Sequence, residues 1–451
     1  MCGRNRKNII KFANKRKIYL KMKKINLLLL LLLAGTFAFA QDFQRYFEDA
    51  TLRIDYNFAG NAHQQTIAVD ELCRMPRWYG KKHRLSELPV EGYGQLTVRD
   101  HRTKEVIYRN SFSTLFQEWL TYDEAKTIKK SFENVFLVPF PKDTADVTIE
   151  LRDNRRRVMA ALTHTVVPTD ILIRRIGEKY VTPYETLQKA ADTTRCIHVA
   201  YVAEGYTDAE MPAFLNDCRT AMEALFAHEP FKSLRNRFNV VAVKSPSAES
   251  GTSIPGKGIW KNTALHSNFD TFYSDRYLTT LHLKTLHNWL AGTPYEHIIV
   301  LVNTENYGGG GILNSYNLSM VRHPAFKPVV VHEFGHSFAG LGDEYGYGDI
   351  PMYPHDIEPW EANLTTLVDL QSKWADMVTK NTPLPTPQPA DLDKPNAKQD
   401  KWKIGAYEPA GYSKHGVYRA YPDCRMRTNQ NPNFCPVCQR AITKLVKFYT
   451  E

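Results

Sequence analysis

The chain has 451 residues, of which 43% are hydrophobic, 24% are charged and 12% are aromatic. These values lie close to globular averages, so they exclude a largely disordered chain, a collagen-like repeat and a coiled coil. The formal net charge is +10, but ten of the 58 Lys and Arg residues lie within residues 1–40, which hold no acidic residue. The other 48 basic residues balance the 48 acidic ones, and we therefore predict no nucleic-acid partner.

Residues 1–40 are typical of a secretory signal peptide, with a basic stretch, a continuous run of leucine over residues 27–33 and a small-residue exit. The apolar run is short for a membrane-spanning helix, and no later segment reaches the roughly eighteen apolar residues that a span needs. We predict cleavage before Gln41, with Met22 as an alternative start of the signal. The mature protein is then expected to have no integral membrane segment and to be secreted, periplasmic or displayed at the cell surface.

The length and the patterning predict a multi-domain protein whose first domain is an all-β sandwich over residues 41–168. Apolar and polar residues alternate over 52–58 and again over 147–151, which is the period of half-buried strands. A short helical stretch is expected near residues 114–130. Residues 169–195 are expected to form a surface connector.

Residues 196–451 predict an α/β (α+β) domain, because strands and helices alternate along this part of the chain. A capping box at Thr207 and Glu210 opens the first amphipathic helix. A second helix is expected over 279–290. The expected strands cover residues 197–202, 238–243 and 297–302.

Residues 332–336 read His-Glu-Phe-Gly-His, which is the HExxH pattern. On a helix that begins near Pro328, the imidazoles of His332 and His336 project from one face and can bind one Zn²⁺. Glu333 is then placed to take a proton from the attacking water and to hand it to the departing amine. The competing interpretation is a buried helix whose two histidines are satisfied by hydrogen bonds.

A third metal ligand is expected just after this helix. Gly340 and Gly342 can end the helix and turn the chain back toward the metal. Asp343 offers an oxygen ligand that would complete a three-residue zinc site with its fourth position open. Glu344 is the competing third ligand.

The segment HEFGHSFAGLGDEY, residues 332–345, resembles the signature of the immunoglobulin A peptidase family, which are secreted zinc endopeptidases related to the metzincins. The cysteine-rich stretch at residues 424–438 is similar to the family's Met-turn region. This resemblance implies a β-sandwich joined to a metzincin-like zinc-peptidase domain, with Met426 beneath the metal as an apolar floor. The glycine and the third ligand of the usual metzincin helix are each displaced by one residue here, to Gly340 and Asp343.

Six cysteines follow the signal peptide, an even number that suits an oxidising compartment. Disulfide bonding that involves Cys424, Cys435 or Cys438 is expected. The Cys435-x-x-Cys438 pair has no second CxxC partner, which argues against a zinc ribbon. The pair also does not open a thioredoxin-like βαβ unit, which argues against redox catalysis. The full set is Cys73, Cys196, Cys218, Cys424, Cys435 and Cys438.

Two further features bear on substrate binding. The glycines at 308–311 precede an alternating run at 316–321, which is interpreted either as an edge strand that pairs with a peptide or as an ordinary strand after a flexible turn. Four tyrosines before Met426 are candidates for a donor to the oxyanion of a tetrahedral intermediate. They are Tyr407, Tyr412, Tyr418 and Tyr421.

The residues favour a secreted zinc endopeptidase that acts on protein or glycoprotein substrates. One alternative is a non-enzymatic surface or glycan-binding protein with a vestigial metal site, although a purely structural zinc has no need of the base Glu333. Another alternative is a zinc amidase that cleaves cell-wall cross-links. Nothing in the chain selects immunoglobulin A itself as the substrate.

Overall fold

The computed structural model describes residues 43–348, 352–392, 394 and 401–451, so the predicted signal peptide lies outside the described residues. Mixed sheets and helices with a separate N-terminal region make the chain a multi-domain α+β protein. Within the described ranges, no helix combines the length and the apolar character that a bilayer crossing requires.

The N-terminal region contains two four-stranded sheets, in the orders β5-β1-β2-β8 and β4-β3-β6-β7. All their pairings are antiparallel except the short one between β2 and β8. The predicted strands at 52–58 and 147–151 lie in β1 and β6. The strands are β1 (Phe47–Gly60), β2 (Gln65–Met75), β3 (Gly94–Asp100), β4 (Val106–Phe112), β5 (Lys130–Pro141), β6 (Ala145–Arg152), β7 (Val158–Val166) and β8 (Arg174–Arg175).

A six-stranded sheet follows, in the order β13-β14-β12-β10-β11-β9. Its four inner strands are parallel, and β9 and β13 run antiparallel at its edges. The three strands predicted in this region are β10, β11 and β12. The strands are β9 (Tyr184–Gln188), β10 (Ile197–Glu204), β11 (Phe238–Val243), β12 (His297–Val302), β13 (Gly309–Ile312) and β14 (Tyr316–Met320).

The helices are α2 (Phe43–Tyr46), α3 (Leu115–Trp119), α4 (Met211–Phe226), α5 (Leu283–Leu290), α6 (Phe326–Ala339) and α7 (Pro436–Thr450). Short 3-10 helices cover Asp123–Lys126, Asp208–Glu210, Arg235–Arg237, Pro255–Lys257, Thr271–Tyr273, Leu370–Ser372 and Ala375–Met377. The predicted capping box is present, with both Thr207 and Glu210 side chains bonded to backbone amides.

Alternate residues of the six-stranded sheet belong to two different cores. In β12, Ile298 and Val300 pack with α5 and with both N-terminal sheets, whereas Ile299 and Leu301 pack with α4, α6 and α7. Because successive side chains of a strand point to opposite faces, the sheet is buried on both sides. The N-terminal sheets therefore share a continuous apolar core with α5 and with one face of the six-stranded sheet.

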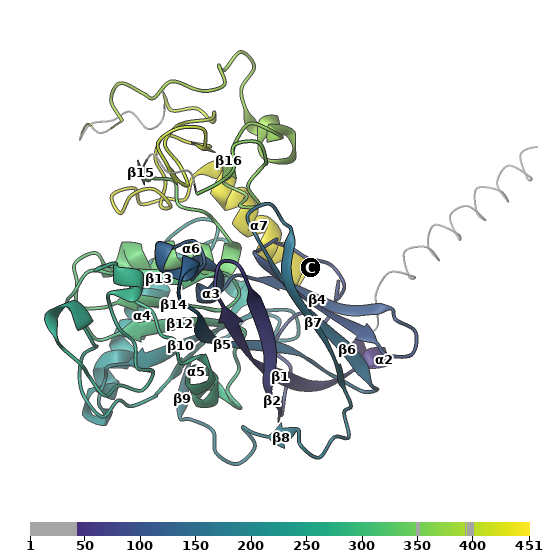
Figure 1. The fold of residues 1–451 in the computed structure, drawn as a ribbon. Coiled ribbons are helices and arrows are strands. Elements are labelled where there is room, and N and C mark those ends of the chain that lie inside the picture. Colours follow the sequence, from purple (N-terminus) through teal and green to yellow (C-terminus); the bar gives the residue numbers. More distant parts are fainter. Residues whose placement is uncertain (1–42, 349–351, 393, 395–400) are drawn as a thin grey trace, which may run out of the picture.

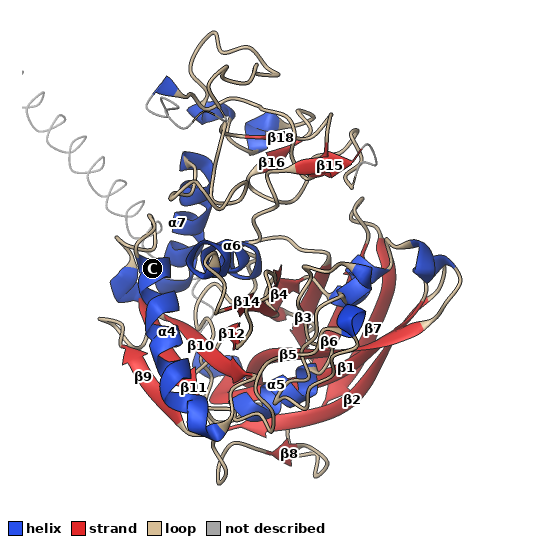
Figure 2. Ribbon diagram, turned by 90° about the vertical axis from the view of Figure 1, so that its left-hand side faces the viewer, coloured by secondary structure: helices blue, strands red, loops and turns tan. Residues whose placement is uncertain are grey.

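The remaining described residues between 346 and 419 form a lobe of loops and short strands beyond α6. In Figure 1 and Figure 2, α6 lies between this lobe and the six-stranded sheet, and α7 runs from the lobe toward the sheet. Two small strand pairs hold the lobe together. They are β15 (Gly346–Gly348) with β17 (Tyr412–Ser413), and β16 (Leu364–Thr365) with β18 (Tyr418–Arg419).

Several expected elements differ in detail from those observed. The helical stretch expected near 114–130 is only α3 and one 3-10 turn, because β5 already begins at Lys130. The helix expected at 279–290 begins at Leu283, and Pro328 is the third residue of α6 instead of the first. The run at 316–321 is not an edge strand, because β14 pairs on both sides and the glycine-rich β13 takes the edge.

Candidate metal centre

Helix α6 carries the HExxH residues and ends where the sequence predicts. Gly340 follows its last residue with φ +59°, in the left-handed region that favours glycine. The amide of Leu341 then donates to the carbonyl of Gly335 at 3.1 Å, so the chain reverses direction within one turn. This reversal brings Asp343 back beside the helix.

Three side chains converge at the helix face. The Nε2 atoms of His332 and His336 are 3.0 Å apart, and Oδ1 of Asp343 lies 3.1 Å from the first and 3.3 Å from the second. The side chain of Asp343 is 4% exposed, whereas those of His332 and His336 are 13% and 15% exposed. The group is thus held by a buried carboxylate and remains open to solvent on the imidazole side.

The outer ring nitrogens fix the tautomers of both imidazoles. Nδ1 of His332 donates to the carbonyl of Arg425 at 3.0 Å, and Nδ1 of His336 donates to the carbonyl of Leu341 at 2.6 Å. With Nδ1 of each ring engaged in this way, the Nε2 atoms are the ones that face each other and the carboxylate oxygen, and they are free to bind a metal once they carry no proton. Three electron-rich atoms that face one another suit a divalent cation, and the backbone carbonyls supply the outer hydrogen bonds that metal-binding histidines normally make. The donor set of two imidazoles and one carboxylate fits zinc.

The electrostatics of these groups agree with a cation-binding role. Burial lowers the pKa of His336, but the Asp343 carboxylate outweighs burial and raises that pKa to about 9. Burial raises the pKa of Asp343, but the two imidazoles outweigh it and hold that pKa far below its usual value. The carboxylate therefore stays ionised and attracts positive charge to the point between the rings.

Glu333 lies beside this group, next to the glycine-rich edge strand. A Cβ atom on Gly309 would come within 2.7 Å of its Oε1, and one on Gly311 within 2.5 Å of its backbone oxygen. Strand β13 can approach α6 this closely only because these positions have no side chain. Burial raises the pKa of the Glu333 carboxyl, and a carboxyl with a raised pKa can accept and later donate a proton nearer to neutral pH.

Met426 is fully buried beneath α6. A Cβ atom on Gly335 would lie 2.7 Å from its sulfur, so the methionine packs against the helix between the two histidines of the motif. Its carbonyl accepts a hydrogen bond from the amide of Glu344 at 2.9 Å. The methionine segment and the segment after α6 are thus tied together under the site.

Of the four tyrosines that the sequence offered, Tyr412 contacts the candidate metal-binding group, where its hydroxyl donates to Oδ2 of Asp343. The hydroxyls of Tyr407 and Tyr421 instead donate to the carbonyls of Lys403 and Trp402. Tyr412 as a whole is 37% exposed, although its hydroxyl is engaged by the buried carboxylate.

Sequence reasoning missed Glu118, a residue of α3 in the N-terminal region. Its carboxylate accepts from the hydroxyl of Tyr277 at 2.5 Å and interacts electrostatically with Asp343 and His336. Burial raises the pKa of Glu118 to about 7. No local signal marks it, because it is more than two hundred residues from the motif in sequence.

Glu344, the competing third ligand, faces away from the histidines. Its Oε1 accepts from the side-chain amide of Asn363 at 2.9 Å and lies 3.2 Å from the sulfur of Cys438. The disulfide expected in this region is absent: all six described cysteines are free thiols. Glu344 instead belongs to a second group that contains three of these cysteines.

Residues 186–401 and 395–446 match the family model described as IgA Peptidase M64, and this match covers more than half of the chain. Residues 42–163 match the model described as Peptidase M64 N-terminus. No curated protein matches the chain.

Proposed function

The chain belongs to the IgA Peptidase M64 family, and from this membership we propose that it is a secreted, zinc-dependent endopeptidase that hydrolyses peptide bonds of protein or glycoprotein substrates. Membership itself makes it a metallopeptidase of a known family and confirms the resemblance in its sequence. The observation that carries the proposal of zinc-dependent peptide hydrolysis is the convergence of His332, His336 and Asp343, with the carboxylate of Glu333 beside them.

We assign the metal to these three side chains. A zinc ion held there would supply the Lewis acidity that polarises a peptide carbonyl and makes water a nucleophile near neutral pH. The imidazoles would hold the ion through Nε2 and the carboxylate through Oδ1, while the hydrogen bonds to Leu341 and Arg425 keep both rings oriented.

Glu333 is assigned as general base and then general acid. Its carboxylate takes a proton from the attacking water, and the same oxygen returns that proton to the amine as the peptide bond breaks. The raised pKa that burial gives this group brings its proton affinity closer to that of the groups it serves. The close approach of Gly309 restricts where the carboxylate can lie.

Tyr412 is assigned as the donor that stabilises the oxyanion. Its hydroxyl already lies at the carboxylate of Asp343, and part of the residue is exposed to solvent. When a substrate carbonyl approaches, the phenol can donate to the oxygen that gains negative charge. Met426 is assigned as the apolar floor beneath the metal.

We further propose the domain division and localisation that the sequence predicts: a signal peptide at 1–40, a β-sandwich at 41–168, a connector at 169–195 and a metzincin-like zinc-peptidase domain at 196–451. The separate family matches at 42–163 and from 186 onward support this division. Export is supported by the charge and leucine pattern of the first 40 residues.

Two variants test the proposal. Glu333→Gln should retain zinc and lose most hydrolysis of a protein substrate, because it removes the base and leaves the three ligands in place. His336→Ala should lose both zinc and activity at this site. Elemental analysis and turnover of each purified variant separate the two effects, and a Glu333→Gln enzyme as fast as the parent would refute the mechanism. Cleavage confined to peptidoglycan would favour a cell-wall amidase instead.

A further inference from the structure

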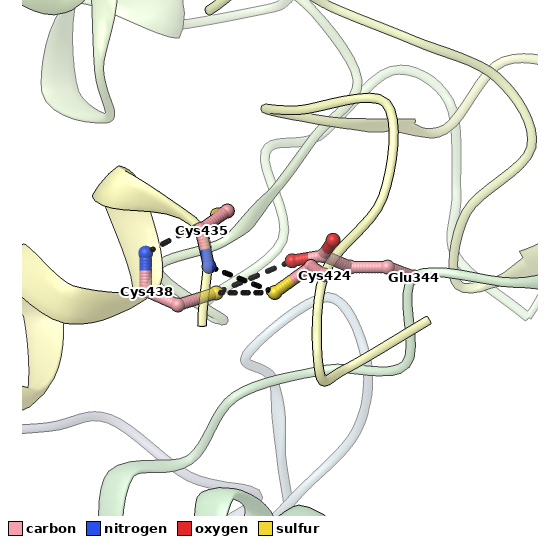
Figure 3. A group of neighbouring side chains, drawn as sticks. All are labelled: Glu344, Cys424, Cys435 and Cys438. Atoms are coloured by element: carbon pink, nitrogen blue, oxygen red, sulfur yellow. Dashed lines mark hydrogen bonds between the residues drawn. The ribbon is translucent and has the colours of Figure 1, made fainter. Parts of the chain in front are cut away.

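A second group of metal-binding side chains lies next to the first and is closed from solvent. The sulfurs of Cys424, Cys435 and Cys438 and one carboxylate oxygen of Glu344 all lie within 4.8 Å of one another. Cys435 is 3% exposed and the other three residues are 0% exposed. Figure 3 shows the sulfurs of Cys424 and Cys438 directed toward the Glu344 carboxylate, which comes from a separate segment.

The spacing of these atoms differs from that of a disulfide and suits a tetrahedral metal. The sulfurs of Cys424 and Cys438 are 3.8 Å apart, whereas a disulfide bond is about 2.05 Å long. Two thiolates bound to one tetrahedral zinc at about 2.3 Å each are separated by about 3.8 Å. The distance of 3.2 Å from Cys438 Sγ to Glu344 Oε1 is close to the corresponding sulfur–oxygen edge, about 3.6 Å.

The carboxylate of Glu344 lacks the partners that a buried charge requires. Its Oε2 is buried and accepts no hydrogen bond from any residue that the structure describes. Its Oε1 is shared between Asn363 and Cys438. A carboxylate removed from water with so few donors is costly unless a cation completes its surroundings.

The backbone around the cysteines is arranged to support thiolates. The amide of Cys435 donates to the sulfur of Cys424 at 3.1 Å, and the amide of Cys438 donates to the sulfur of Cys435 at 3.5 Å. Cys435 caps the N-terminus of α7, a helix of 15 residues whose free amides favour negative charge. The buried guanidiniums of Arg419 and Arg425 also interact electrostatically with Cys424.

We propose that Glu344, Cys424, Cys435 and Cys438 bind a structural Zn²⁺, distinct from the metal of the proposed catalytic group. Three thiolates select zinc over magnesium or calcium, and four protein ligands leave no open position for water or substrate. Each thiol gives up its proton to solvent as its sulfur binds the ion. A bound metal would also keep these cysteines from pairing in an oxidising compartment.

This second site joins the segments that position the first. Glu344 follows Asp343, and Cys424 precedes the Arg425 carbonyl that orients His332. The Glu344 amide also donates to the Met426 carbonyl, so the same two segments already meet through their backbones. The structural zinc would fasten both segments to α7 and thereby fix the third ligand and one imidazole of the active site.

Metal content of purified, tag-free protein tests the proposal. We expect about two zinc ions per chain in the parent and about one in His336→Ala. Cys435→Ser should lose the second ion, whereas the matched control Cys196→Ser, a thiol outside the group, should keep both. Equal zinc content in Cys435→Ser and the parent would overturn the proposal.

A direct measurement covers the case in which Cys435→Ser fails to fold. The zinc absorption edge of His336→Ala should show a sulfur shell at about 2.3 Å. A zinc shell of nitrogen and oxygen alone, a zinc-free but folded protein, or a Cys424–Cys438 disulfide found by peptide mapping without reductant would each refute the site. If His336→Ala holds sulfur-bound zinc while Glu333→Gln remains fully active, the second site stands and the proposed catalytic mechanism falls.

Discussion

Tyr412 donates a hydrogen bond to Oδ2 of Asp343, while Oδ1 of the same carboxylate faces the imidazoles of His332 and His336. The phenol therefore orients the third candidate ligand, and in the mechanism proposed above it would turn to a substrate oxygen. The amide of Tyr412 also donates to the carbonyl of Tyr345 at 2.8 Å, which fixes the backbone of the tyrosine beside the site.

We expect Tyr412→Phe to keep its zinc and to lower kcat by about 10²–10³, with a smaller change in KM, because it removes one donor to the transition state. Steady-state kinetics on a protein substrate with parallel zinc analysis would measure this. Tyr407→Phe is the matched control, since its hydroxyl bonds to the Lys403 carbonyl away from the metal group. Equal kcat in Tyr412→Phe and the parent would remove the tyrosine from the mechanism.

Gly309 tests how closely the edge strand must approach the base. A methyl group there would meet Oε1 of Glu333 at 2.7 Å and force the carboxylate to move. We expect Gly309→Ala to fold and to bind zinc but to hydrolyse substrate at least about tenfold more slowly, because catalysis is sensitive to displacements of about an ångström.

Gly311→Ala is the comparison for this variant. Its methyl group would lie 2.5 Å from the backbone oxygen of Glu333, and a helix backbone cannot move aside as a side chain can. Overpacking of this kind costs about 1–3 kcal/mol, so we expect a lower melting temperature than in Gly309→Ala. The proposed constraint of Gly309 on the Glu333 carboxylate is contradicted if Gly309→Ala is less stable than Gly311→Ala or retains full activity.

Arg53 connects the N-terminal sheets to the six-stranded domain. Its guanidinium bonds to Asp55 at 2.7 Å within β1 and to the side chain of Asn288 in α5 at 2.7 Å, and it is 1% exposed. We expect Arg53→Met to lower the free energy of unfolding by about 3–5 kcal/mol, because it strands a buried carboxylate. Urea denaturation would measure this loss.

Arg174→Met is the control for the buried pair, since Arg174 and its partner Glu71 are 54% and 35% exposed. An exposed pair of this kind contributes about 1 kcal/mol or less. The apolar core is continuous between the N-terminal sheets and the six-stranded sheet. Both variants, Arg53→Met and Arg174→Met, should therefore unfold in one transition. Separate transitions for the two halves of the chain would contradict this coupling.

The sequence was sufficient where the chemistry depends on neighbours in the chain. His332 and His336 share a helix face because they are four residues apart, and the turn at Gly340 returns Asp343 to them. The alternation in β1 and β6 and the apolar run of β12 likewise identified strands, because burial imposes the same period locally.

The sequence failed where long-range packing decides. The CxxC spacing alone did not indicate the second candidate metal group, because Glu344 and Cys424 are eighty residues apart and meet only through the fold. Nothing local separated Tyr412 from the other tyrosines near it. The sequence also did not show that the glycines of β13 form the edge strand. Their position depends on how the strands pair and on how α6 packs against them, which are long-range features of the fold.

His297 should make the protein sensitive to acid. The ring is enclosed by Phe334, Phe338 and Tyr449, and its Nε2 is buried without a hydrogen bond from any described residue. Burial, assisted by His198, lowers the pKa of His297 to about 3, far below the value of about 6.5 in an unfolded chain. Between pH 6.5 and 3 the unfolded chain therefore binds a proton that the native state does not, and stability falls as the pH falls through this window.

The loss from one such histidine approaches about 1.4 kcal/mol per pH unit within the window and totals about 2 kcal/mol between pH 7.5 and pH 5. His297→Leu removes this proton-binding site. Its free energy of unfolding should therefore fall by about 2 kcal/mol less than that of the parent between pH 7.5 and pH 5, as measured by urea denaturation at both pH values. His63→Gln, an exposed position, should behave as the parent does. An identical pH dependence in His297→Leu and the parent would show that another group controls acid unfolding, and His198 is the next candidate because burial lowers its pKa to about 4.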